Sequence, residues 1–190
     1  MKLKLFIDVM KMKTPKLLGL FVVLLASVAV HAQHLDFMGV PINGTLEQFG
    51  KGLQAKGFVL TEDVEGDPRK WYEGTFEGEE VTLVVSPTPV SGTVYGVMAV
   101  VEVKRKDEKN AKVIFEKFNK IVVERYGDNR KEYDESRDET HLQTTHYVNK
   151  NQGNITVSIQ DMVGGYAVSI DYLDIVNLLK KDDESKQRPK

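Results

Sequence analysis

Apolar residues between positions 45 and 57 recur with the spacing of an α-helix. Those on one helical face are Leu46, Phe49 and Leu53. Thr45 and Gln48 form a T-x-x-Q capping box at the start, with Asn43 as an alternative cap, and Gly57 suits the left-handed turn that ends a helix. The helix also contains Gly50 and Gly52. Because glycine weakens a helix, we expect these two to permit close packing on a sheet.

A second, longer helix is predicted between residues 107 and 126. Asp107 can cap its start, and Gly127 follows its end. The apolar stripe that repeats every three or four positions is Ala111, Ile114, Phe115, Phe118, Ile121 and Val122. This stripe predicts that one side of the helix is buried on the rest of the molecule.

Alternating apolar and polar residues mark the strands. The predicted strands are 71–76, 80–86, 93–103, 142–148, 154–160 and 166–173. Residues 58–60 open a further strand directly after the first helix, and residues 175–179 form a short closing helix. Since 93–103 is apolar on both faces, we place it in the middle of the sheet.

The order of helix, glycine, polar connection and strands occurs twice, in residues 35–103 and again in 104–179. Few side chains match between the two halves, so the repeat is one of topology. The predicted fold is α+β: a single antiparallel sheet of six to eight strands built from two α-β-β-β halves. Both long helices pack on one face of that sheet, and residues 33–179 form one domain.

The first 32 residues have the pattern of a secretory signal peptide. Lysines precede an apolar run at 17–30, and cleavage is expected after Ala32. The apolar run of 14 residues is short for a membrane span, which needs about 20. Translation can start at Met1, Met10 or Met12. We therefore expect an exported protein, either periplasmic or extracellular.

Composition and net charge exclude several classes of function. The chain has no cysteine, which excludes a lipoprotein anchor at the cleavage site, disulfides and thiol chemistry. Without residues 1–32 it carries 21 basic and 27 acidic residues, a net charge of −6. This balance argues against a nucleic-acid partner. The almost wholly polar residues 180–190 are predicted to form a disordered tail.

Part of the chain resembles a bacterial group. The residues concerned are Phe37-Met38-Gly39-Val40-Pro41, Gly44-Thr45, Phe49, Leu53, Lys56-Gly57-Phe58 and Tyr126-Gly127. In these it is similar to small signal-peptide-bearing proteins of Bacteroidetes-type bacteria whose function is uncharacterised, which implies an exported α+β protein without a defined activity. The layout also resembles the tandem α–β repeats of secreted beta-lactamase inhibitor proteins, although those carry disulfides that this chain lacks.

The sequence contains no motif that commits the chain to a reaction. His141 and His146 are five residues apart on one strand, so they point to opposite faces and cannot share a metal; we expect both at the surface or a sheet edge. Asp171 and Glu102 are the acidic residues inside strands, and we interpret both as polar residues on a solvated sheet face. No catalytic residue, metal or cofactor is predicted.

The sheet face away from the helices is the best candidate for function. Its predicted residues are Thr82, Val84, Met98, Thr156, Ser158 and Ser169, with Trp71 and Tyr72 as aromatic anchors. We expect a non-enzymatic binding protein whose partner is a protein or a glycan. The alternatives are a small periplasmic hydrolase with a carboxylate-based site and a subunit of a cell-envelope assembly.

Overall fold

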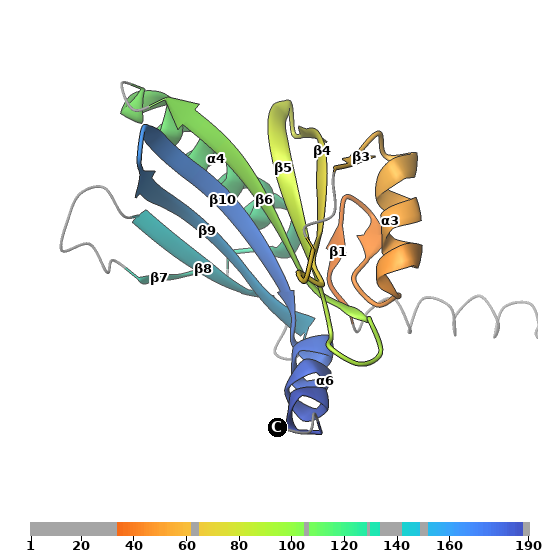
Figure 1. The fold of residues 1–190 in the computed structure, drawn as a ribbon. Coiled ribbons are helices and arrows are strands. Elements are labelled where there is room, and N and C mark those ends of the chain that lie inside the picture. Colours follow the sequence, from red (N-terminus) through yellow and green to blue (C-terminus); the bar gives the residue numbers. More distant parts are fainter. Residues whose placement is uncertain are drawn as a thin grey trace, which may run out of the picture. The chain divides into compact units, whose positions relative to one another are not determined.

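The structure is a computed structural model that describes residues 34–61, 65–104, 107–128, 130–133, 142–148 and 152–187. For residues 130–133 it describes the backbone. These residues all belong to one compact unit that begins at His34 (Figure 1). The predicted signal peptide and His141 lie outside the described residues.

One antiparallel sheet of eight strands organises this unit. Its strands are β3 (Val59–Leu60), β4 (Lys70–Phe76), β5 (Glu79–Pro87), β6 (Val94–Lys104), β7 (Arg130–Tyr133), β8 (Leu142–Val148), β9 (Gly153–Met162) and β10 (Gly165–Asp174). The spatial order is β3-β4-β5-β6-β10-β9-β8-β7. Each half of the chain thus starts at one edge of the sheet and advances to its centre, where β6 pairs with β10.

The predicted α+β fold is confirmed. Each half is a helix followed by antiparallel strands, with the short edge strands β3 and β7 as the first strand of each half. The two halves therefore contribute four strands each, one more per half than the α-β-β-β order predicted from the sequence.

Both long helices begin and end close to the positions that their caps predict. Helix α3 (Leu46–Ala55) has the full capping box: the Gln48 N–H donates to Thr45 Oγ1 at 3.3 Å, and the Thr45 N–H donates to Gln48 Oε1 at 3.0 Å. Helix α4 (Glu108–Tyr126) begins after Asp107, whose carboxylate accepts the N–H of Asn110 at 3.3 Å.

Helices α3 and α4 cover the same face of the sheet. Helix α4 packs on β6, β8, β9 and β10, and α3 contacts β5 and β3. The core between helices and sheet includes Phe49 and Leu53 of α3, Phe115 and Phe118 of α4, and residues such as Leu83, Val97, Ile155 and Ile170 of the strands. Burial of these apolar stripes, each with the period of its own element, holds the layers together.

The glycines of α3 permit close packing, as expected. A Cβ at Gly50 would overlap the hydroxyl of Tyr72 on β4. A Cβ at Gly52 would lie 2.6 Å from Val40 Cγ1, inside van der Waals contact. The helix can therefore approach its neighbours only because both positions lack side chains.

The segment before α3 forms a small hairpin of its own, β1 (Asp36–Phe37) paired with β2 (Val40–Pro41). Phe37 is fully buried, and its ring centroid lies 5.0 Å from that of Phe76 and 5.4 Å from that of Tyr172. Aromatic contacts of this kind add stability beyond the area that they bury. The hairpin thus joins β4 and β10, which come from different halves of the chain.

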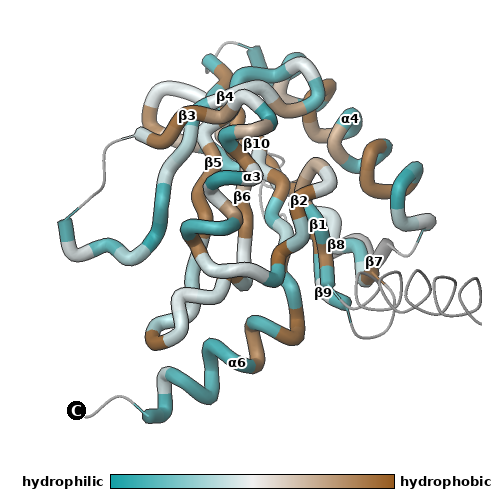
Figure 2. Tube along the Cα trace, turned by 90° about the vertical axis from the view of Figure 1, so that its right-hand side faces the viewer, coloured by the Kyte–Doolittle hydropathy of each residue, from teal (hydrophilic) through white to brown (hydrophobic). Residues whose placement is uncertain are grey.

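The C-terminal segment differs from the predicted disordered tail. Helix α6 (Ile175–Lys186) contains the short closing helix predicted at 175–179, and it continues through residues 180–186, which we expected to be disordered. Figure 2 shows that α6 is mostly hydrophilic, so it lacks the apolar stripe by which sequence analysis finds a packed helix. Hydrogen bonds hold it instead: the Glu184 carboxylate accepts the N–H groups of Val90 and Ser91 at 2.8 and 3.1 Å and the Ser91 hydroxyl at 2.6 Å.

Candidate binding face

The face of the sheet opposite α3 and α4 is the candidate site, and we call it the open face. Strand residues alternate between the two faces, and residues paired across strands share a face. The central row of the open face, taken across the strands, is Trp71, Val84, Met98, Asp171, Thr156 and Thr145. The next row is Glu73, Thr82, Val100, Ser169, Ser158 and Gln143.

The structure brings seven of the eight predicted residues together on this face. Tyr72 is the exception, because it alternates with Trp71 and points to the opposite face. Its side chain is only 4% exposed and belongs to the core. Tyr72 therefore cannot serve as a surface anchor. The sequence could have shown this, because adjacent residues of a strand point to opposite faces of the sheet.

Hydroxyl groups on the β8–β10 side of the open face bond to one another. Ser158 and Ser169 lie 2.9 Å apart between their Oγ atoms, and Thr145 and Thr156 lie 3.2 Å apart between their Oγ1 atoms. Ser158 is itself buried. These hydroxyls have therefore satisfied part of their hydrogen-bonding capacity within the sheet.

Asp171 occupies the centre of the open face, between Met98 of β6 and Thr156 of β9. Burial raises the pKa of its carboxyl to about 6, because a desolvated carboxylate is disfavoured. No described residue donates a hydrogen bond to this carboxyl or forms an ion pair with it. The sequence predicted Asp171 as a polar residue on a solvated sheet face, but it could not show that the side chain is half-buried there.

A hollow of about 710 Å³ lies over the half of the open face formed by β3 to β6. The side chains that line it include Val59, Glu73, Thr75, Glu80, Thr82, Val100 and Glu102. Its three glutamates are exposed. Glu102 is therefore a solvated residue of this face, as expected, and it gives the hollow an acidic rim together with Glu73 and Glu80.

His146 is a core residue and not the surface or edge histidine that we expected. It is 1% exposed, and its Nε2 lies 2.8 Å from Asn119 Oδ1 of α4. Asn119 in turn donates its Nδ2 to the Phe115 carbonyl at 3.1 Å. The sequence prediction for His146 was wrong because the residue that contacts its Nε2, Asn119, belongs to a helix that is distant in the sequence. Within the described ranges, no group of three acidic or histidine side chains could hold a metal ion.

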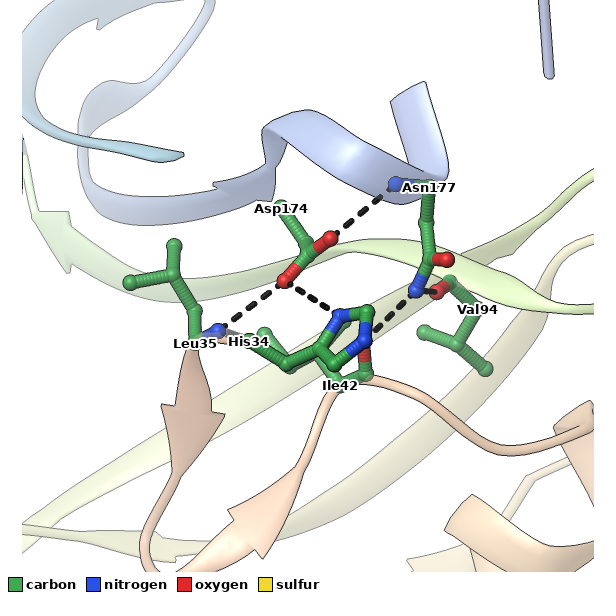
Figure 3. Close-up of polar contacts among 6 residues, drawn as sticks. All are labelled: His34, Leu35, Ile42, Val94, Asp174 and Asn177. Carbon is green, nitrogen blue, oxygen red and sulfur yellow. Dashed lines mark hydrogen bonds and ion pairs between the residues drawn. The ribbon is translucent and has the colours of Figure 1, made fainter. Parts of the chain in front are cut away.

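A second polar cluster lies at the end of β10, where it joins three parts of the chain (Figure 3). Buried Asp174 accepts the Leu35 N–H at 2.9 Å and the Asn177 N–H at 3.0 Å, and one of its oxygens lies 3.1 Å from His34 Nδ1. Asn177 donates to the carbonyls of Ile42 and Val94. Apart from the contact with the His34 ring, each of these bonds joins a side chain to a backbone group of another segment, so this cluster is structural.

Comparison with known proteins does not assign the chain to a family: no family model matches it, and no curated protein or solved structure is significantly similar. None of the described helices is long and apolar enough to cross a membrane.

Proposed function

We propose that the chain is an exported, non-enzymatic binding protein that holds a protein or glycan partner on the open face. The observation that carries this proposal is the carboxyl of Asp171, which is half-buried at the centre of that face and has no hydrogen-bond or ion-pair partner among the described residues. Removing a carboxylate from water without a compensating contact costs free energy. A partner that donates hydrogen bonds or a positive charge to Asp171 would recover that cost on binding. Export is supported by the pattern of the first 32 residues.

A hydrolase is the second candidate, because a carboxyl with a pKa near 6 can act as a general acid. The sheet register provides no second carboxyl beside it. Glu102 pairs with Ala167, which lies four residues along β10 from Asp171. At about 3.3 Å per residue that separation is roughly 13 Å. Paired catalytic carboxyls of glycosidases stand only about 5 to 10 Å apart. Binding therefore fits the open face better than carboxylate-pair catalysis.

The test is a cross-linking pull-down with residues 33–190, using envelope extract and spent medium of the native host. We expect a single saturable partner that is lost on Met98→Glu or Thr156→Arg. Val113→Glu is the matched control, because Val113 is 57% exposed on α4, away from the open face. Circular dichroism confirms that each variant is folded.

Three outcomes distinguish the candidates. A partner that is insensitive to both changes on the open face, or no partner above background, would refute the proposal. Hydrolysis by the purified protein that is abolished by Asp171→Asn would favour the hydrolase. A partner that copurifies in fixed stoichiometry would identify the chain as a subunit of an envelope assembly that uses the same face.

A further inference from the structure

We infer that the partner of the open face is a basic protein, which places a lysine or arginine side chain against Asp171. This inference rests on the proposed function and specifies the chemistry of the partner. It follows from the residues around Asp171 and from the charge of the open face. It also follows from the contacts already made by the hydroxyl groups and the aromatic ring that a glycan would use.

The positions around Asp171 contain nothing that could neutralise it. On β10 its neighbours on the same face are Ser169 and Leu173. The surrounding positions on β6 and β9 are Gly96, Met98, Val100, Asn154, Thr156 and Ser158. None of these eight residues is titratable. A cation brought by a partner would therefore be the first charge to meet this carboxylate.

Two other partly buried carboxylates have cationic partners: Asp36 is paired with Arg125, and Glu79 lies 2.6 Å from Lys117. Buried Glu184 is held by N–H and O–H donors instead. Asp171 differs from all three because no described residue donates to it or pairs with it. Pairing a desolvated charge recovers much of the cost of its burial, which makes a cation the most favourable contact at this position.

Counted over the described side chains, the open face is acidic: it carries the carboxylates of Glu73, Glu80, Glu102 and Asp171 against the ammonium group of Lys104. The sheet register also places Lys131 of β7 on this face, opposite Thr145, which leaves more carboxylates than lysines. Arg69 lies near this face, but its guanidinium already pairs with Asp67 at 2.6 Å. A face with this charge attracts a basic protein surface and repels an acidic one.

A glycan fits the face less well. Sugars stack on exposed aromatic rings, yet the Arg69 guanidinium lies 5.6 Å from the Trp71 ring centroid and covers one side of that ring. Sugars also need free polar groups, but Ser158 bonds to Ser169 and Thr145 bonds to Thr156. Asp171 places a negative charge at the centre of the face, and that charge favours a cation over a neutral sugar.

The test uses a random 12-residue peptide library displayed on phage and panned against residues 33–190. We expect the selected peptides to share a lysine or arginine. A synthetic copy is then paired with Asp171→Asn in a double-mutant cycle, in which the shared basic residue of the peptide is replaced by norleucine. The two changes should be coupled by roughly 10-fold or more in Kd. Glu116→Gln, which removes an exposed carboxylate from α4 on the other side of the sheet, is the control and should change Kd by less than about 3-fold.

The outcomes separate this inference from the proposed function. Binding that is lost on Thr156→Arg but shows no coupling to Asp171 would overturn the inference and leave the open face as the binding site. An oligosaccharide bound in a glycan array, and lost on Thr156→Arg, would overturn it in favour of a glycan. If no selected peptide and no arrayed glycan responds to Thr156→Arg, both the inference and the proposed function fail.

Discussion

Replacing Asp171 with asparagine removes a carboxyl that loses its solvation when the chain folds. In the folded protein the pKa of Asp171 is about 6, whereas the ordinary value is 3.8. Between these two values the folded state binds more protons than the unfolded state, so stability falls as pH rises. The destabilisation from this carboxyl is absent below about pH 4 and complete above about pH 6.

The size of this destabilisation follows from the difference of about two between the pKa of Asp171 in the folded protein and its ordinary value. Each unit corresponds to about 1.4 kcal/mol, so ionised Asp171 costs at most about 3 kcal/mol at neutral pH. Asparagine has nearly the same shape and no charge. The amide does not titrate, so its own effect on stability is the same at every pH. The charge of Asp171 is therefore reported by the pH dependence of the difference in the free energy of unfolding between variant and wild type.

The assay is urea unfolding followed by the fluorescence of Trp71, the single tryptophan of the chain. We compare the free energy of unfolding of Asp171→Asn with that of wild type at each pH. The difference should be larger at about pH 7.5 than at about pH 3.5, by about 2 to 3 kcal/mol in favour of the variant. Glu102→Gln removes an exposed carboxylate from the same face and should show no comparable increase.

A difference that stays constant within about 0.5 kcal/mol across that range would show that Asp171 is solvated in the folded protein. A difference that falls with rising pH would show that Asp171 has a stabilising partner within the chain. Either result would remove the unpartnered carboxyl on which the proposed function depends.

Two further predictions test how the fold is held together. The Ser91 hydroxyl, followed by the backbone N–H groups of Ser91 and Val90, lowers the pKa of Glu184 to about 2. Its stabilising contribution is therefore complete above the ordinary pKa of 4.5 and lost as pH falls toward 2. Glu184→Gln should speed hydrogen exchange at the Val90 and Ser91 amides at neutral pH, and unchanged exchange would contradict the anchoring of α6. At Gly74 a Cβ would lie 2.8 Å from Phe58 Cε1, inside van der Waals contact. Gly74→Ala should thus lower the free energy of unfolding by about 1–3 kcal/mol in urea, whereas Thr75→Ala on the exposed face should not; equal stability of the two variants would refute this packing.

Local signals determined the elements of this protein from the sequence alone. The capping box of Thr45 and Gln48 placed the start of α3, and the apolar stripe of α4 identified its buried side. Alternation along the strands assigned Thr82, Met98, Thr156 and Ser169 to one face. These features depend on groups a few residues apart, because capping and side-chain periodicity are properties of a single helix or strand.

Long-range contacts decided the rest. The sequence predicted only residues 175–179 of α6, because residues 180–186 are polar. This second part is anchored by Glu184, which binds a loop more than 90 residues away in the sequence. His146 is buried because Asn119 of α4 meets its ring. The pairing of β10 with β6 and β9 places Asp171 between neighbouring strands and shields it in part from water. Desolvation depends on every neighbour that surrounds a group in space, so only the tertiary structure could distinguish Asp171 from the other carboxylates of the chain.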